Sequence, residues 1–250
     1  EGAAMRGKHT MLRAVLIVLA ALFLLPCLLL ALPLAGAPLD ALWAAVTSPA
    51  YLQSYRNTLA LAVGGVVLQT AAALPAGYVL ARGVSRRTRR ICLALCGLLM
   101  LLPQQALMLP QYLILQQLGL LDTLAGLLLV TAFQPWMVLL FWFGASRLDG
   151  ELFDAAACDG AAGATFARRV YLPLMAPYLA AAALLSMAES WNLLEQPMIF
   201  LQQKTRYPLS VLLSRLPEAE PAQKLFAGLL FLLPLAIAFG AICGGKNRRR

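Results

Sequence analysis

Residues 57–81 read NTLALAVGGVVLQTAAALPAGYVLA, and this run decides the fold class. It carries no charge, and Gln69 and Pro75 interrupt an otherwise apolar stretch. A helix needs about 20 predominantly apolar residues to cross a hydrocarbon core about 30 Å thick, because each residue rises about 1.5 Å. Residues 57–81 are therefore long enough to cross a membrane as one helix.

The composition of the whole chain agrees with a membrane location. Of the 250 residues, 61% are apolar and 12% are charged, whereas soluble domains have roughly half apolar and a quarter charged residues. Intrinsic disorder is excluded because disordered chains are poor in apolar residues. The net charge of +9 does not predict nucleic-acid binding, because the basic residues form short clusters between apolar runs. We therefore expect a polytopic membrane protein that contacts lipid and no nucleic acid.

Five further apolar runs cover residues 14–35, 91–121, 123–146, 174–196 and 225–243. The run that starts at Ile91 is too long for one span, and Pro103 and Pro110 break it. We predict a helix to about Leu102, followed by a loop or interfacial segment that carries Gln104, Gln105, Gln116 and Gln117. The pattern predicts an all-α polytopic membrane protein with six transmembrane helices, in a single domain over residues 1–250.

Lysine and arginine residues in short loops indicate how such a chain is oriented. If both ends of a six-span chain are cytoplasmic, 15 of the 20 basic residues fall inside and five outside, and this asymmetry favours that topology. A competing interpretation of residues 14–35 is a cleavable signal peptide that ends at Ala35-Gly36-Ala37. The run is longer than the roughly 7–15 residues of a signal core, so we expect a span.

No catalytic or metal-binding pattern occurs in the sequence. The only histidine, His9, lies in a basic tail, so a serine or cysteine triad has no base. Five cysteines are an odd number, four lie in apolar runs, and none belongs to a cluster with metal-ligand spacing. Residues 240–247 match a phosphate loop only in part, because Asn247 replaces the magnesium-binding Ser or Thr and the stretch ends an apolar helix. We expect no enzyme activity and no bound cofactor; ATP and Mg would belong to another subunit.

The connection between the fourth and fifth runs, residues 147–173, is unusually elaborate: RLDGELFDAAACDGAAGATFARRVYLP. Residues 151–158 favour a helix that Gly160 ends, and a second short helix over 161–170 leads to Pro173 at the start of the fifth span. One interpretation is a helical connection on the membrane surface. The other is a docking element, in which small Ala155 and Ala156 admit a partner backbone and Asp154 and Asp159 offer carboxylates to its basic groups.

The spacing of this loop resembles the EAA loop of binding-protein-dependent ABC importer permeases. That loop reads Glu-Ala-Ala, three residues, Gly, nine residues, Ile-x-Leu-Pro, and this chain has Asp154-Ala155-Ala156, Gly160 and Val170-Tyr171-Leu172-Pro173. Asp replaces Glu and Val replaces Ile. Shorter matches at residues 55–59, 77–82, 118–123 and 191–192 resemble the MalG-like carbohydrate class. The resemblance implies the type I ABC importer permease (MetI-like) fold.

The resemblance also implies a set of partners in the bacterial cytoplasmic (inner) membrane. These are a second homologous permease, two ATPase subunits that hold ATP and Mg, and an external solute-binding protein. It further implies that Asp154, Ala155, Ala156, Asp159 and Gly160 form the ATPase-coupling helix, which moves as a rigid body when the ATPases close. The polar outer loop over 202–224 is a candidate surface for the binding protein, while the arginines over 86–90 are expected to contact anionic lipid.

Polar residues within the fifth run are candidates for the translocation pathway, because charges inside a span are costly. On a helix, Ser186, Glu189, Asn192 and Gln196 fall within an arc of roughly 120°. Glu195 points elsewhere, and Pro197 is expected to end or kink the helix. Two interpretations stay open: the stripe offers hydrogen bonds to a hydroxyl-rich solute, or Glu189 pairs with the partner permease or stays protonated between helices.

The expected function is therefore a non-catalytic permease subunit of an ATP-driven importer, with a sugar or oligosaccharide as solute. One alternative is an importer of another small polar solute, such as a polyamine. A second alternative is a secondary transporter or channel that needs no ATPase, against which stand the EAA spacing and the lack of an obvious inverted repeat.

Overall fold

The computed structural model describes residues 37–158, 160, 163–215 and 221–244. Every regular element among these residues is helical. The α-helices are α2 (Leu39–Thr47), α3 (Pro49–Tyr78), α4 (Arg86–Leu101), α5 (Gln104–Gln117), α6 (Leu124–Thr131), α7 (Pro135–Ser146), α8 (Gly150–Cys158), α9 (Gly163–Phe166), α10 (Leu172–Trp191), α11 (Glu195–Phe200), α12 (Leu209–Ser214) and α13 (Pro221–Gly244). Two π-helical turns, η1 (Val79–Gly83) and η2 (Ala167–Tyr171), and a 3-10 turn, η3 (Lys204–Arg206), complete the set.

Two helices of the described part are long and apolar enough to cross a membrane, Pro49–Gly83 and Gly163–Trp191. Two bent pairs meet the same test when each is taken as one span: α4 with α5, bent by 98°, and α6 with α7, bent by 49°. These four correspond to the second to fifth predicted runs, and α13 corresponds to the sixth. The predicted first span, residues 14–35, lies outside the described residues.

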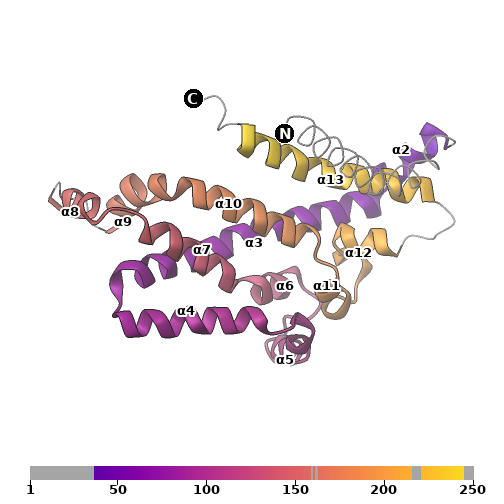
Figure 1. Ribbon diagram of the computed structural model, residues 1–250. Helices are drawn as coiled ribbons and strands as arrows, with labels where there is room; N and C mark the ends of the chain where they lie inside the picture. Colours follow the sequence, from indigo (N-terminus) through magenta and orange to yellow (C-terminus); the bar gives the residue numbers. More distant parts are fainter. Residues whose placement is uncertain (1–36, 159, 161–162, 216–220, 245–250) are drawn as a thin grey trace, which may run out of the picture.

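Helices α3, α7 and α10 lie side by side and form the centre of the bundle, with α4 along the outer side of α7 and α13 along α10 (Figure 1). Their shared core includes the fully buried Met137, Phe141 and Met175. Gly77 of α3 makes the contact with α7 possible, because a Cβ there would lie 2.6 Å from Cβ of Phe141.

Two predicted boundaries differ from the structure. The segment after Leu102 is not a loop but helix α5, which crosses the end of α4 and contains Pro110 in its interior. Pro173 lies in the first turn of α10, as predicted. The predicted boundary between the loop helix and the fifth span is absent, because α9 runs into α10 through the π-turn η2. The Leu172 amide donates to the Ala167 carbonyl five residues earlier, so the second loop helix and the fifth span form one helix.

Candidate functional site

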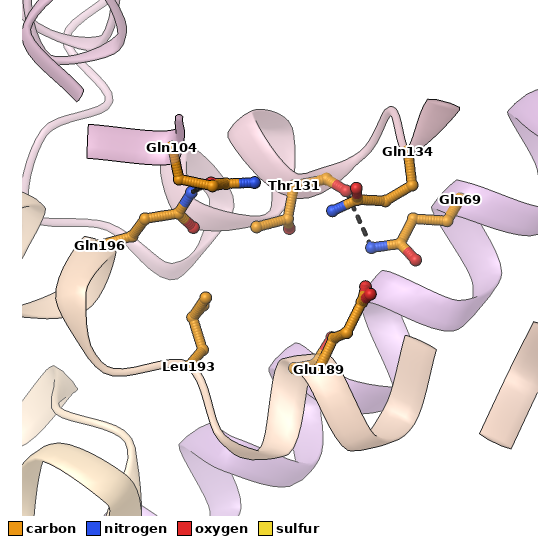
Figure 2. Close-up of a pocket in the computed structure, with 8 residues that line it drawn as sticks. Gln69, Gln104, Thr131, Gln134, Glu189, Leu193 and Gln196 are labelled. Carbon is orange, nitrogen blue, oxygen red and sulfur yellow. Dashed lines mark hydrogen bonds between the residues drawn. The ribbon is translucent and has the colours of Figure 1, made fainter. Parts of the chain in front are cut away.

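A polar cavity of about 250 Å³ lies where three of the spans break. The breaks separate α4 from α5, α6 from α7, and α10 from α11. Figure 2 shows that the side chains point into the cavity from these breaks and from α3. The lining residues are Gln69, Gln104, Thr131, Gln134, Glu189, Ser190, Leu193 and Gln196.

Proline explains the break between α6 and α7. Pro135 has no amide hydrogen, so the carbonyl of Thr131, four residues earlier, loses its helical donor. Gln69 of α3 replaces that donor, because its Nε2 donates to the Thr131 carbonyl at 2.8 Å (Figure 2). The Oε1 of Gln69 accepts from Ser186 Oγ at 2.6 Å, so this buried amide joins α6 to α10. The polar interruption seen at Gln69 in the sequence thus stabilises a broken helix.

The break between α10 and α11 uses the same device. Pro197 has no amide hydrogen for the carbonyl of Leu193, four residues earlier. The Ser210 hydroxyl of α12 donates to that carbonyl at 2.5 Å. Irregular backbone at membrane depth is tolerated where other groups satisfy it and where it lines a cavity. Both breaks meet this condition.

Two hydrogen bonds join α5 to α11 at the mouth of the cavity. Gln196 Nε2 donates to Gln104 Oε1 at 3.0 Å, and Gln105 Nε2 donates to Glu195 Oε2 at 3.0 Å. Trp136 Nε1 donates to the carboxylate of the lining residue Glu189, at 3.3 Å from its Oε2. The cavity is therefore framed by amides and one carboxylate, which are groups suited to binding hydroxyls.

The predicted pathway residues separate into two groups. Glu189 and Gln196 line the cavity, whereas Ser186 is fully buried behind it and Asn192 is exposed and donates to the Ala188 carbonyl. The expected stripe on one helix is wrong, because α10 ends at Trp191 and Gln196 belongs to α11.

Sequence reasoning missed the lining residues of the other segments: Gln69, Gln104, Thr131 and Gln134. A signal for them exists, since Gln104 and Gln134 each adjoin a proline, Pro103 and Pro135, inside an apolar run. A polar residue beside a helix-breaking proline is a sign of a discontinuous span that lines a site.

Of the predicted coupling residues, Asp154, Ala155 and Ala156 lie on α8, at the opposite end of the bundle from the cavity (Figure 1). Ala155 is exposed, whereas Ala156 is only 7% exposed and packs toward its own chain. Gly160 has φ +71°, the left-handed conformation predicted for a helix stop. Asp154 lies within α8, and Asp159 lies outside the described residues.

Aromatic contacts hold α8 against the bundle. The ring of Phe153 lies 6.2 Å from Tyr78 of α3 and 5.4 Å from Phe166 of α9. Tyr171 completes this aromatic cluster, with its ring 5.1 Å from Tyr78. The guanidinium of Arg82 lies 4.5 Å from the centre of the Phe153 ring and donates to the Leu148 carbonyl. Helix α8 is therefore joined to two of the helices that carry cavity residues: α3 and the continuous helix over Gly163–Trp191.

Comparison with known proteins agrees with this arrangement. Residues 73–244 match the family described as binding-protein-dependent transport system inner membrane component. The chain is 31% identical over 192 residues to the arabinooligosaccharides transport system permease protein AraQ of Bacillus subtilis (strain 168). The aligned residues are 76% of this chain and 68% of that protein. It is 26% identical over 189 residues to the lactose transport system permease protein LacG of Rhizobium radiobacter, with 74% and 69% covered.

Solved structures match over nearly the whole chain. One is the crystal structure of a bacterial ABC transporter involved in the import of the acidic polysaccharide alginate, with a TM-score of 0.83, 22% identity, and coverage of 96% of this chain and 97% of that chain. Another is the alginate ABC transporter in complex with an alginate pentasaccharide-bound periplasmic protein, with a TM-score of 0.73, 14% identity and 96% of each chain covered. The predicted importer permease fold is thereby confirmed. The chain belongs to the family of binding-protein-dependent transport system inner membrane components, the membrane permease subunits of ABC importers.

Proposed function

We propose that this chain forms one half of the translocation pathway of an ATP-driven importer of sugars or oligosaccharides. Its partners are a second homologous permease, two ATPase subunits that bind ATP and Mg, and an external solute-binding protein. The named solutes of two relatives, arabinooligosaccharides and lactose, support a carbohydrate. The excess of basic residues in alternate loops supports a topology with both termini in the cytoplasm of a bacterium.

The observation that carries the proposal is that the same two helices join the α8 end to the cavity. Helix α3 contacts α8 through Tyr78 and reaches the cavity with Gln69. The helix over Gly163–Trp191 contacts α8 through Phe166 and reaches the cavity with Glu189, about 35 Å away at 1.5 Å per residue. Motion imposed on α8 by an ATPase would therefore reach the cavity along continuous helices rather than through loops.

The chemistry of the cavity suits a sugar. Four glutamine amides and one carboxylate offer hydrogen bonds in both senses, and hydroxyl-rich solutes require both. In this proposal Glu189 and Gln196 contact the solute, while Ser186 positions Gln69 and Asn192 has no direct role. The break between α10 and α11, which Glu189 and Gln196 flank, is the part of the pathway expected to change shape when α8 moves.

Co-purification tests the assembly. The chain is co-expressed with its chromosomal neighbours, extracted in mild detergent, and its companions are identified. We expect a second permease and two ATPase copies. Recovery of the chain alone, folded and able to move solute without ATP, would contradict the proposal and favour a secondary transporter.

A substitution on α8 tests the ATPase contact. Ala155→Arg places a long side chain on the exposed face and should abolish attachment of the ATPase and sugar uptake, while Ala155→Ser keeps the residue small and should preserve both. The structure favours Ala155 over Ala156 for this test, because a large side chain at the buried Ala156 would disturb the chain itself. Unchanged attachment in a folded Ala155→Arg variant would refute α8 as the coupling helix.

A further inference from the structure

Gln196 supplies the cavity with a buried hydrogen-bond acceptor. Gln196 is only 6% exposed, and its Nε2 is used by Gln104. Its Oε1 has no hydrogen-bond partner within the part of the chain that the structure describes. Leaving a buried acceptor unpaired is unfavourable, so a ligand that donates an O–H to this oxygen is favoured.

The charge of the cavity has one sign. Among the described residues that line the cavity, Glu189 is the only charged one, and none is Lys, Arg or His. Among the described residues, Trp136 donates only to Oε2 of Glu189. The Glu189 side chain points into the cavity (Figure 2). A carboxylate on the ligand would therefore meet like charge, and no described lining residue would supply a compensating cation.

We infer that this cavity accepts neutral, hydroxyl-rich sugars and rejects sugars that carry carboxylates, an inference that rests on the proposed function. Hydroxyl groups of a neutral sugar donate to Gln196 Oε1 and to Glu189, and the amide of Gln134 can serve as donor or acceptor. The cavity also differs from a site for a polycation, because a polycation needs several anionic partners and the described lining has one carboxylate beside four amides. Since a transporter of an acidic polysaccharide has the same fold, the lining residues and not the fold decide the charge preference.

The preference can be measured without the binding protein, by testing whether a bound solute protects an introduced thiol in the cavity from alkylation. Leu193→Cys places the thiol in the cavity wall, and the five native cysteines are replaced by serine. The assembled, nucleotide-free complex is alkylated with the uncharged reagent N-ethylmaleimide, and the modified peptide is quantified by mass spectrometry. Arabinotriose, trigalacturonate or spermidine is added in excess at matched ionic strength. Glu189→Gln serves as the test variant, and Glu195→Gln, which removes a carboxylate outside the lining, is the matched control.

We expect arabinotriose to slow alkylation about fivefold, equivalent to about 1 kcal/mol, and trigalacturonate to change it less than about twofold. Glu189→Gln should extend protection to trigalacturonate, while Glu195→Gln should leave the pattern unchanged. Equal protection by both sugars in the parent, protection by spermidine alone, or protection by none of the three would overturn the inference. Uptake by the complete complex separates the two claims, because failure to import any sugar refutes the proposed function, whereas import without the expected protection refutes only the charge preference.

Discussion

The side chain of Gln69 donates to the backbone carbonyl of Thr131, which Pro135 has left without a helical partner. A residue 62 positions earlier in the chain thus completes the hydrogen bonding of a broken span. Backbone groups in a membrane must be satisfied internally, since no water is available there. Gln69 therefore stabilises the break, and the two features form one structural unit beside the cavity.

Gln69→Leu should destabilise the permease by about 1–3 kcal/mol, because it leaves the Thr131 carbonyl and the Ser186 hydroxyl buried without partners. The measurement is the thermal unfolding midpoint of the purified complex in detergent. Gln117→Leu, at an exposed position of α5, is the control with the same change in chemistry and should leave the midpoint unchanged. Identical midpoints for both variants would show that the Gln69 bonds contribute nothing.

Gly77→Ala should separate α3 from α7 and destabilise the bundle by about 1–3 kcal/mol, as overpacking usually does. A Cβ at this position would lie 2.7 Å from the Trp142 amide nitrogen as well as against Phe141, and backbone atoms cannot move aside cheaply. Gly97→Ala is the matched control, since its Cβ would meet nothing within 4 Å. Yield of monodisperse protein and its unfolding midpoint give the readout, and a loss at Gly97 equal to that at Gly77 would contradict the explanation.

Phe153→Ala should uncouple ATP hydrolysis from transport, because it removes the ring that joins α8 to Tyr78, Phe166 and Arg82. Each aromatic contact is worth about 0.5–1.5 kcal/mol, so α8 would no longer move rigidly with α3 and α9. We expect several-fold less solute imported per ATP hydrolysed, with the ATPase still attached. Leu152→Ala, one residue earlier and exposed, should keep the ratio of the parent. An unchanged ratio in Phe153→Ala would exclude the aromatic cluster as the connection.

Asp122 should hold the loop over 201–207 at every pH above about 4. Burial raises its pKa, but the amides of Gln203 and Gln202 and the guanidinium of Arg206 outweigh this and lower the pKa below its usual value. With a folded pKa below the unfolded value of about 3.9, the stabilisation is complete above that value. It is lost as the pH falls through the folded pKa.

Hydrogen exchange at the amides of Gln202 and Gln203 measures this contribution. Asp122→Asn should speed their exchange at neutral pH, because an amide oxygen is a weaker acceptor and carries no charge, while Asn tolerates the local φ of +56°. After correction for intrinsic rates, protection in the parent should be constant from about pH 5 to 8 and fall only below about pH 4. Asp149→Asn, exposed at the other end of the bundle, should have no effect on these amides. Protection that changes between pH 5 and 8 would contradict the assignment.

Several features follow from the sequence because their causes are local. Apolar runs of spanning length became helices at the second to sixth predicted positions, since length and composition alone decide whether a segment can cross a membrane. The left-handed Gly160 and the helix ahead of it were predicted from residue types within one turn. Glu189 stood out because a charge within an apolar run is costly wherever the helix packs.

Other features depend on contacts between distant segments. The sequence shows that proline removes an amide donor at positions 135 and 197, but only the tertiary structure decides that Gln69 and Ser210 replace it. The cavity likewise combines residues from α3, α5, α6, α10 and α11, which no single helical wheel brings together. Gln196 shares the cavity with Glu189 because α10 stops at Trp191 and α11 turns back toward α5. The sequence by itself determined which segments are apolar and long enough to span a membrane and where proline removes an amide donor, because both are properties of the segment. The packing of α3 against the breaks decided where the site lies, because the partners of a freed carbonyl are set by proximity in space.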